Sequence, residues 1–151
     1  NALVNDDPEA AAGASRKATE ALNHVDMALL EGAANDHWMM LLMPMKKALK
    51  NIESTTDIEK QRAQFNTLSN NIIDMTESFG LEADIVYKQY CPMAFDDAGA
   101  HWLSESDEVL NPYFGDMMLH CGEVQETYKR GQRIFNTEEM NETPATQSHN
   151  H

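Results

Sequence analysis

The chain has few cysteines, few basic residues and no long apolar run. Its two cysteines are fewer than strong metal-binding motifs supply. Eleven basic residues against 25 acidic ones give a formal net charge of −14, which repels nucleic-acid backbones and anionic lipid headgroups. The longest apolar run, Trp38 to Met43, is far shorter than the roughly 20 residues that span a bilayer. We therefore expect neither nucleic-acid binding nor membrane insertion.

The sequence signatures of common enzyme classes are also missing. The chain contains no glycine-rich phosphate loop, no serine nucleophile elbow and no His-Glu-x-x-His zinc helix. A thiol nucleophile needs a base within reach, and His120 would point to a different helical face from the adjacent Cys121. We expect a protein that is not an enzyme.

The composition is that of one folded domain. Apolar residues make up 42% and charged residues 24% of the 151 residues, which is ordinary for a globular protein and sufficient for one hydrophobic core. The last 16 residues are polar and show no apolar period. We expect a single helical-bundle domain over residues 1–135 and a flexible tail over residues 136–151.

Two amphipathic helices are predicted in the first 55 residues. Asp7 and Pro8 are typical of a helix N-terminus, where an N-cap and a proline match the free backbone amides. A second helix is expected to follow a cap at Asn35 or Asp36 and to bend near Pro44. Its apolar residues recur at steps of three and four, as in a bundle seam: Trp38, Leu42, Met45, Leu49 and Ile52.

The third helix has the clearest signals. Thr56 and Glu59 form a capping box, and Gly80 supplies a left-handed stop. One face between them carries Ile58, Phe65, Leu68, Ile72, Met75 and Phe79. Three such helices joined by short connectors should run antiparallel around a shared core.

The sequence changes character after residue 80. Residues 85–90 are β-branched and aromatic, and a turn at residues 96–99 precedes His101 and Trp102, so a short hairpin is predicted. Residues 117–134 carry apolar side chains at near-helical steps and predict a short helix. The predicted fold class is mainly α: an antiparallel helical bundle of three long helices plus a short C-terminal helix, with a small β-hairpin.

Sulfur and imidazole side chains are concentrated after residue 85. Cys91 and Met93 are two positions apart on an extended segment, so both sulfurs can point to one side. Met118 and Cys121 are three apart on the expected helix and would be neighbours there. Two such pairs facing each other would form a pocket whose thiolate and thioether ligands favour Cu(I) or Ag(I). The predicted metal ligands are Cys91, Met93, Met118 and Cys121, with Met117, His120 and His37 as secondary candidates.

Two other interpretations of these residues stay open. In an oxidising compartment, Cys91 and Cys121 could form a disulfide worth roughly 3 to 4 kcal/mol for a loop of this length. A reversible pair would alternate between the thiol and the disulfide. Methionine also fills gaps in protein cores. We therefore expect the Met-rich segment from His37 to Met45 to belong mainly to the core, and we keep it only as an auxiliary soft-metal site.

Three motifs resemble those of an uncharacterised bacterial domain family. They are Tyr-Lys-Gln-Tyr-Cys-Pro-Met-Ala at 87–94, Gly-Ala-His-Trp-Leu-Ser at 99–104 and Asn-Pro-Tyr-Phe-Gly-Asp-Met-Met-Leu-His-Cys-Gly-Glu-Val at 111–124. The likeness extends back through residues 57–80 and more loosely through the first two helices. The family occurs alone as exported proteins. It also occurs fused to the C-terminal end of periplasmic adaptor subunits of copper and silver RND efflux systems, chiefly in Bacteroidetes.

The resemblance implies an exported, periplasmic protein and favours the soft-metal role. Carried over by position, the resemblance implies that the metal ligands are Cys91, Met93, Met118 and Cys121. The chain departs from the family at Met117, where a polar or charged residue is common. We therefore expect a periplasmic Cu(I) or Ag(I) binding module of heavy-metal efflux or homeostasis, with an efflux adaptor or a metallochaperone as partner. The alternative is a disulfide-stapled protein-interaction module of the cell envelope that binds no metal.

Overall fold

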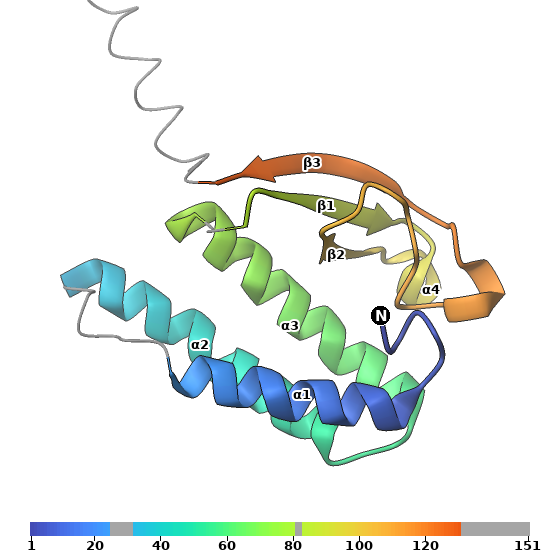
Figure 1. Ribbon diagram of the computed structural model, residues 1–151, viewed down its shortest axis with the longest axis horizontal. Helices are drawn as coiled ribbons and strands as arrows, with labels where there is room; N and C mark the ends of the chain where they lie inside the picture. The colour runs from blue at the N-terminus through green and yellow to red at the C-terminus, as the bar shows by residue number, and fades with distance from the viewer. Residues whose placement is uncertain (25–31, 81–82, 131–151) are drawn as a thin grey trace, which may run out of the picture.

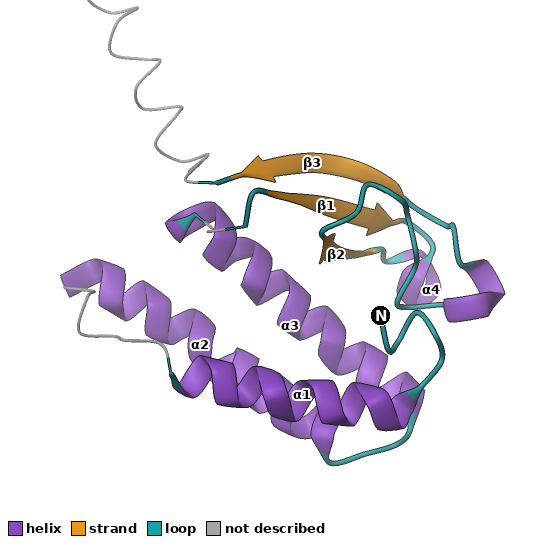
Figure 2. Cartoon of the chain, in the orientation of Figure 1, coloured by secondary structure: helices purple, strands orange, loops and turns teal. Residues whose placement is uncertain are grey.

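The computed structural model describes residues 1–24, 32–80 and 83–130, and it contains three long helices and a small sheet. The long helices are α1 (Pro8–Asn23), α2 (Gly32–Glu53) and α3 (Ile58–Phe79), as Figure 1 shows. The strands are β1 (Ile85–Cys91), β2 (Ala100–Ser104) and β3 (Glu123–Lys129), drawn in orange in Figure 2. Two short helical turns are α4 (Ala94–Asp97) and η2 (Gly115–Met118).

The helix α3 lies between the other two long helices and the sheet. Along the chain, α1, α2 and α3 alternate in direction, so each is antiparallel to the next, as predicted (Figure 1). α2 contacts both α1 and α3, and β2 packs against α3 (Figure 1). Both the helical layer and the sheet therefore depend on α3 for their relative placement.

The ends of the helices follow from local capping. The Asp7 carboxylate accepts a hydrogen bond from the Ala10 amide at 3.0 Å, which confirms the predicted start of α1 at Pro8. α2 begins at Gly32, ahead of the predicted cap at Asn35 or Asp36, and it continues through its internal proline as one helix.

The start of α3 differs by one residue from the prediction. Asp57 is its N-cap, because the Asp57 carboxylate accepts hydrogen bonds from the Glu59 and Lys60 amides, whereas the predicted capping box would start at Thr56. The helix ends at Gly80, whose φ of +79° favours glycine, as predicted.

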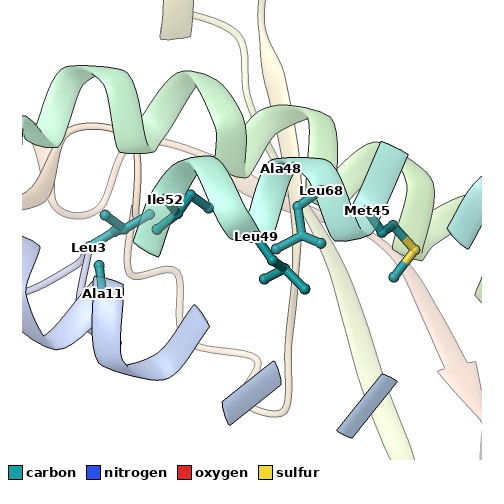
Figure 3. Close-up of a cluster of buried hydrophobic side chains, with 7 residues drawn as sticks. All are labelled: Leu3, Ala11, Met45, Ala48, Leu49, Ile52 and Leu68. Carbon is teal, nitrogen blue, oxygen red and sulfur yellow. The ribbon is translucent and has the colours of Figure 1, made fainter. Parts of the chain in front are cut away.

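The main core consists of the apolar stripe of α2 and of residues from α1, α3 and the segment before α1 that pack against it. Its buried members, drawn in Figure 3, are Leu3, Ala11, Met45, Ala48, Leu49, Ile52 and Leu68. Each fully buried leucine or isoleucine stabilises the fold by about 1.5–3 kcal/mol. The buried Gln61 amide closes the end of this core by donating to the carbonyl oxygens of Pro8, Ile52 and Thr55.

The predicted C-terminal helix is wrong, and with it the predicted fold class. Residues 115–118 form only the turn η2, and residues 123–129 form β3, so the sheet has three antiparallel strands in the order β2-β1-β3. β1 and β2 pair as the predicted hairpin does, but β3 pairs with the other edge of β1. The protein is therefore three long helices with a three-stranded sheet.

The physical reason for the error lies at Gly122 and in the spacing that follows it. Gly122 has a φ of +138°, which is not a helical value, so the chain cannot continue helically through it. A Cβ there would lie 2.8 Å from the Tyr90 carbonyl oxygen, so the position requires glycine. The four-residue step from Val124 to Tyr128 is even, and it is as compatible with the period of a strand as with a helix.

Part of the prediction lies outside the described residues. This applies to residues 131–135 of the expected domain and to the expected tail over 136–151. Within residues 1–24, 32–80 and 83–130, no helix combines the length and hydropathy that crossing a bilayer requires.

Candidate metal centre

The structure brings the two cysteines together. Cys91 is the last residue of β1 and is fully buried, whereas Cys121 lies in the irregular segment before β3 and is half-buried. Their Sγ atoms are 2.9 Å apart, and both cysteines are free thiols. Cys91 pairs with Ala100 of β2, so the thiols lie at the end of the sheet beside α4 (Figure 1).

The environment of Cys121 favours its protonated form. A hydrogen bond with Cys91 raises the pKa of the Cys121 thiol, burial raises this pKa further, and the Met93 backbone amide lowers it in part. A thiol must lose its proton before it can act as a metal ligand. A metal ion binding here would therefore displace protons from the pair.

An apolar cluster surrounds the thiols. Its buried members are Cys91, Ala94, Ala100, Trp102 and Tyr113, with Phe65, Val109, Phe114 and Cys121 packed around them. The Tyr113 hydroxyl donates to the His101 carbonyl oxygen at 2.6 Å, and burial raises the pKa of Tyr113 well above its ordinary value. The thiols therefore lie against a mainly apolar cluster.

Asn111 positions the segment that carries Cys121. Its side-chain amide donates to the Cys121 carbonyl oxygen at 2.8 Å, while its carbonyl oxygen accepts from the amides of Tyr113 and Phe114. The Asn111 backbone amide also donates to the Leu119 carbonyl oxygen. Sequence reasoning identified Asn111 only as the first residue of the motif at 111–124, although an Asn-Pro pair is the available signal for this kind of side-chain cap.

The predicted methionine ligands meet in a pocket next to the thiols. Met93, Met117 and Met118 line one pocket of about 520 Å³. Neither Cys91 nor Cys121 lines it. Three residues belong both to the pocket wall and to the apolar cluster around the thiols: Ala94, Tyr113 and Phe114. The predicted ligand set is therefore divided between a thiol pair and an adjoining thioether pocket.

A buried arginine that sequence reasoning missed connects this region to the first residues of the chain. Arg62 of α3 donates to the carbonyl oxygens of Leu3 and Pro112 and binds the Asp6 carboxylate at 2.8 Å. The other Asp6 oxygen accepts from the Asp116 amide at 3.0 Å. These hydrogen bonds hold residues 1–7 against the loop that leads into η2.

Of the secondary histidine candidates, His37 lies far from the thiols, whereas His120 is next to Cys121 in the chain but contacts a backbone carbonyl oxygen. His37 Nε2 lies 3.0 Å from Ser78 Oγ at the C-terminal end of α3. Ser78 is about 24 Å along α3 from Arg62, at 1.5 Å per residue. His120 is exposed, and its Nδ1 lies 3.0 Å from the Val109 carbonyl oxygen. Among the described residues, no group of three or more His, Cys, Asp or Glu side chains could hold a metal ion.

Comparison with known sequences places the helical part of the chain in a family. The sequence model of the family described as "Protein of unknown function (DUF3347)" matches residues 1–84, which is more than half of the chain. The match covers α1, α2 and α3 and ends before the four predicted metal ligands, Cys91, Met93, Met118 and Cys121. No curated protein and no solved structure matches the chain. Membership in an uncharacterised family is thus confirmed: the chain belongs to the family Protein of unknown function (DUF3347).

Proposed function

We propose that the protein binds Cu(I) or Ag(I) reversibly through the thiolates of Cys91 and Cys121, with the thioethers of Met93 and Met118 beside them. The observation that carries this proposal is the 2.9 Å distance between two sulfur atoms that are 30 residues apart in the chain. Thiolate and thioether ligands select soft, closed-shell ions such as Cu(I) over hard ions such as Mg²⁺. The acidic chain also attracts cations in general.

Metal binding would require a small movement of one thiol. Metal–thiolate bonds of about 2.3 Å, the length found in zinc sites, separate two sulfurs by about 3.8 Å at a tetrahedral angle and by more at a wider angle, so the pair must open by at least roughly 0.9 Å. Cys91 is fixed at the end of β1, whereas Cys121 lies in irregular backbone between η2 and β3. The movement is therefore expected at Cys121, whose partial exposure also leaves a sulfur edge for exchange with a partner.

We further propose a location and a role for this site. The resemblance of residues 87–124 to exported proteins and to domains of periplasmic efflux adaptors favours a periplasmic buffer, or a donor of metal to an efflux adaptor or metallochaperone. A small number of sulfur ligands suits such exchange, because a partner can add its own ligand before the first ones leave.

The second candidate is a disulfide-stapled interaction module of the cell envelope that binds no metal. The observation that favours it is the full burial of Cys91 in an apolar cluster, where an oxidised pair would be as well accommodated as a reduced one. A disulfide closing this loop would stabilise the fold by roughly 3 to 4 kcal/mol.

Thiol counting followed by a copper competition separates the two candidates. Free thiols are counted before and after mild reduction, and the reduced chain then competes for Cu(I) with a chromogenic chelator. The soft-metal proposal predicts transfer of copper to the reduced chain and weaker competition by Met93→Leu and Met118→Leu at unchanged helix content. Met40→Leu is the control, because Met40 is 72% exposed on α2 and distant in sequence from the site. Failure of the reduced chain to take up copper would exclude the first candidate.

A further inference from the structure

Three methionines from two separate segments line one pocket that adjoins the cluster around the thiol pair. Met93 follows β1, and Met117 and Met118 end η2, yet all three line the pocket of about 520 Å³ described above. The first two are poorly buried: Met93 is 47% and Met117 82% exposed. The pocket therefore carries methionines on at least two exposed positions, and thioether sulfur is a donor for soft ligands.

Core filling does not account for these side chains. Methionine fills a core gap when its thioether is enclosed, as Met45 is in the helical core at 3% exposure. Met93 and Met117 gain little from burial, because much of their apolar surface remains in water. Met40 and Met43 of α2 are similarly exposed, so what distinguishes Met93 and Met117 is the pocket that they share with Met118.

The charges around the pocket favour a cation. Three carboxylate residues line it, namely Glu59, Asp96 and Asp97. The pocket has one guanidinium, Arg62, whose charge is already engaged by Asp6 at 2.8 Å and by Glu59 at 3.7 Å. Carboxylates attract cations of any kind, and thioethers select the soft ones among them.

The thiols do not line the thioether pocket, although Ala94, Tyr113 and Phe114 belong both to its lining and to the cluster around the thiols. The pocket and the thiols adjoin at Met93, whose backbone amide donates a hydrogen bond to the Cys121 sulfur. We propose that Met93, Met117 and Met118 bind one Cu(I) or Ag(I) ion by themselves, including when Cys91 and Cys121 form a disulfide. This inference deepens the proposed function and rests on its soft-metal chemistry.

The two sites differ in their proton balance. Binding to a thiol pair breaks S–H bonds and releases protons to the solvent, whereas a thioether sulfur donates a lone pair and carries no proton to lose. Neither site changes the oxidation state of the metal. A thiol-independent site would keep the protein loaded under oxidising conditions and would hold a metal ion next to the thiols when they become reduced.

The test uses the full chain carrying Cys91→Ser and Cys121→Ser, titrated calorimetrically with silver nitrate in chloride-free buffer. The expected result is one equivalent of Ag(I) bound, with the same heat in buffers of different ionisation enthalpy because no proton is released. Should the double variant fail to fold, as judged by circular dichroism, the air-oxidised wild-type chain with no free thiols replaces it.

Leucine variants in this background locate the site. Replacing Met93, Met117 and Met118 together by leucine should weaken Ag(I) binding at least about tenfold, a loss of about 1.4 kcal/mol. The matched control replaces the exposed methionines of α2, and it should leave the affinity unchanged: Met39, Met40 and Met43. Binding that survives the first triple variant, or that disappears in the second, would overturn the assignment.

The outcomes also separate this inference from the proposed function. If the reduced wild-type chain binds metal and the cysteine-free chain does not, the thioether site is refuted and the thiol function stands. If both chains bind the same single equivalent without proton release, the thiols are not ligands, and the thioether site stands alone. If neither chain binds Ag(I), both ideas are wrong.

Discussion

The guanidinium of Arg62, which is buried on α3, lies 2.8 Å from the Asp6 carboxylate. Through this pair and the Asp116 amide, residues 1–7 are tied to the loop that carries the methionines of η2. The contact spans 56 positions of the chain, and it joins the helical layer, the first residues and the candidate site. Stability and site geometry should therefore respond together when it is changed.

Asp6→Asn should destabilise the fold by about 1–3 kcal/mol, because it leaves the buried Arg62 guanidinium with only the more distant Glu59 as an anionic partner. Urea denaturation of the two chains at pH 7 measures the difference. Asp107→Asn is the control, since Asp107 is an exposed carboxylate, and it should lie within about 0.5 kcal/mol of the original chain. A stability equal to the control would show that the ion pair contributes nothing.

The same contact predicts a pH dependence of stability. The hydrogen bond from the Asp116 amide and that from Arg62 hold the pKa of Asp6 below its ordinary value in the folded chain. Because this pKa is lower in the folded than in the unfolded state, the contribution is present above about pH 4 and is lost as the pH falls through the folded value. The stability difference between the original chain and Asp6→Asn should thus be constant from pH 5 to 7 and shrink at lower pH. A difference that grows on acidification would have the wrong sign.

Gly115→Ala should destabilise the protein by about 2 kcal/mol. Gly115 has a φ of +59°, where an L side chain is strained, and a Cβ there would collide with the Asp6 carboxylate. Gly13→Ala is the matched substitution, because nothing lies within 4 Å of a Cβ at this helical position. It should raise stability by roughly 0.5–1 kcal/mol, so thermal melts of the two variants should shift in opposite directions. Equal shifts of the two melting temperatures would contradict the positive φ of Gly115.

Substitutions of Asn111 should loosen the Cys121 segment. Asn111→Ala removes three side-chain hydrogen bonds from a buried position and should cost about 3 kcal/mol. Asn111→Asp keeps the acceptor for the Tyr113 and Phe114 amides but cannot donate to the Cys121 carbonyl oxygen. The reduced Asn111→Asp chain should therefore stay folded while Cys121 reacts faster with iodoacetamide, as mass spectrometry can measure. An unchanged alkylation rate would show that Asn111 does not position the thiol.

The helical half of the fold is readable from the sequence because its signals are local. The cap at Asp7, the stop at Gly80 and the apolar steps of α2 each depend on residues within a few turns of one another. β3 is not readable in this way, since its pairing with β1 is set by contacts about 40 residues apart and its side chains are mostly exposed. Its apolar spacing fits a helix equally well, and only Gly122 signals the break.

The candidate site is likewise only partly predictable from the sequence. The convergence of Cys91 and Cys121 follows from a long-range strand pairing, so the sequence could suggest it through residue chemistry alone. Two positioning residues are not predicted: a buried arginine such as Arg62 has no distinctive spacing in a single sequence, and the Asn-Pro pair at Asn111 signals a side-chain cap without showing that it holds Cys121. The methionines line a pocket that the thiols do not, and this arrangement is set by side-chain packing, which a single sequence does not show.

The central claim is that Cys91 and Cys121 bind a soft metal ion together. X-ray absorption at the copper edge of the fully reduced chain, loaded with one equivalent of Cu(I), tests it most directly. The account predicts a first coordination shell of sulfur only, which loses its thiolate component in the Cys91→Ser and Cys121→Ser chain. A shell of nitrogen and oxygen, or a reduced chain that takes up no copper, would contradict it.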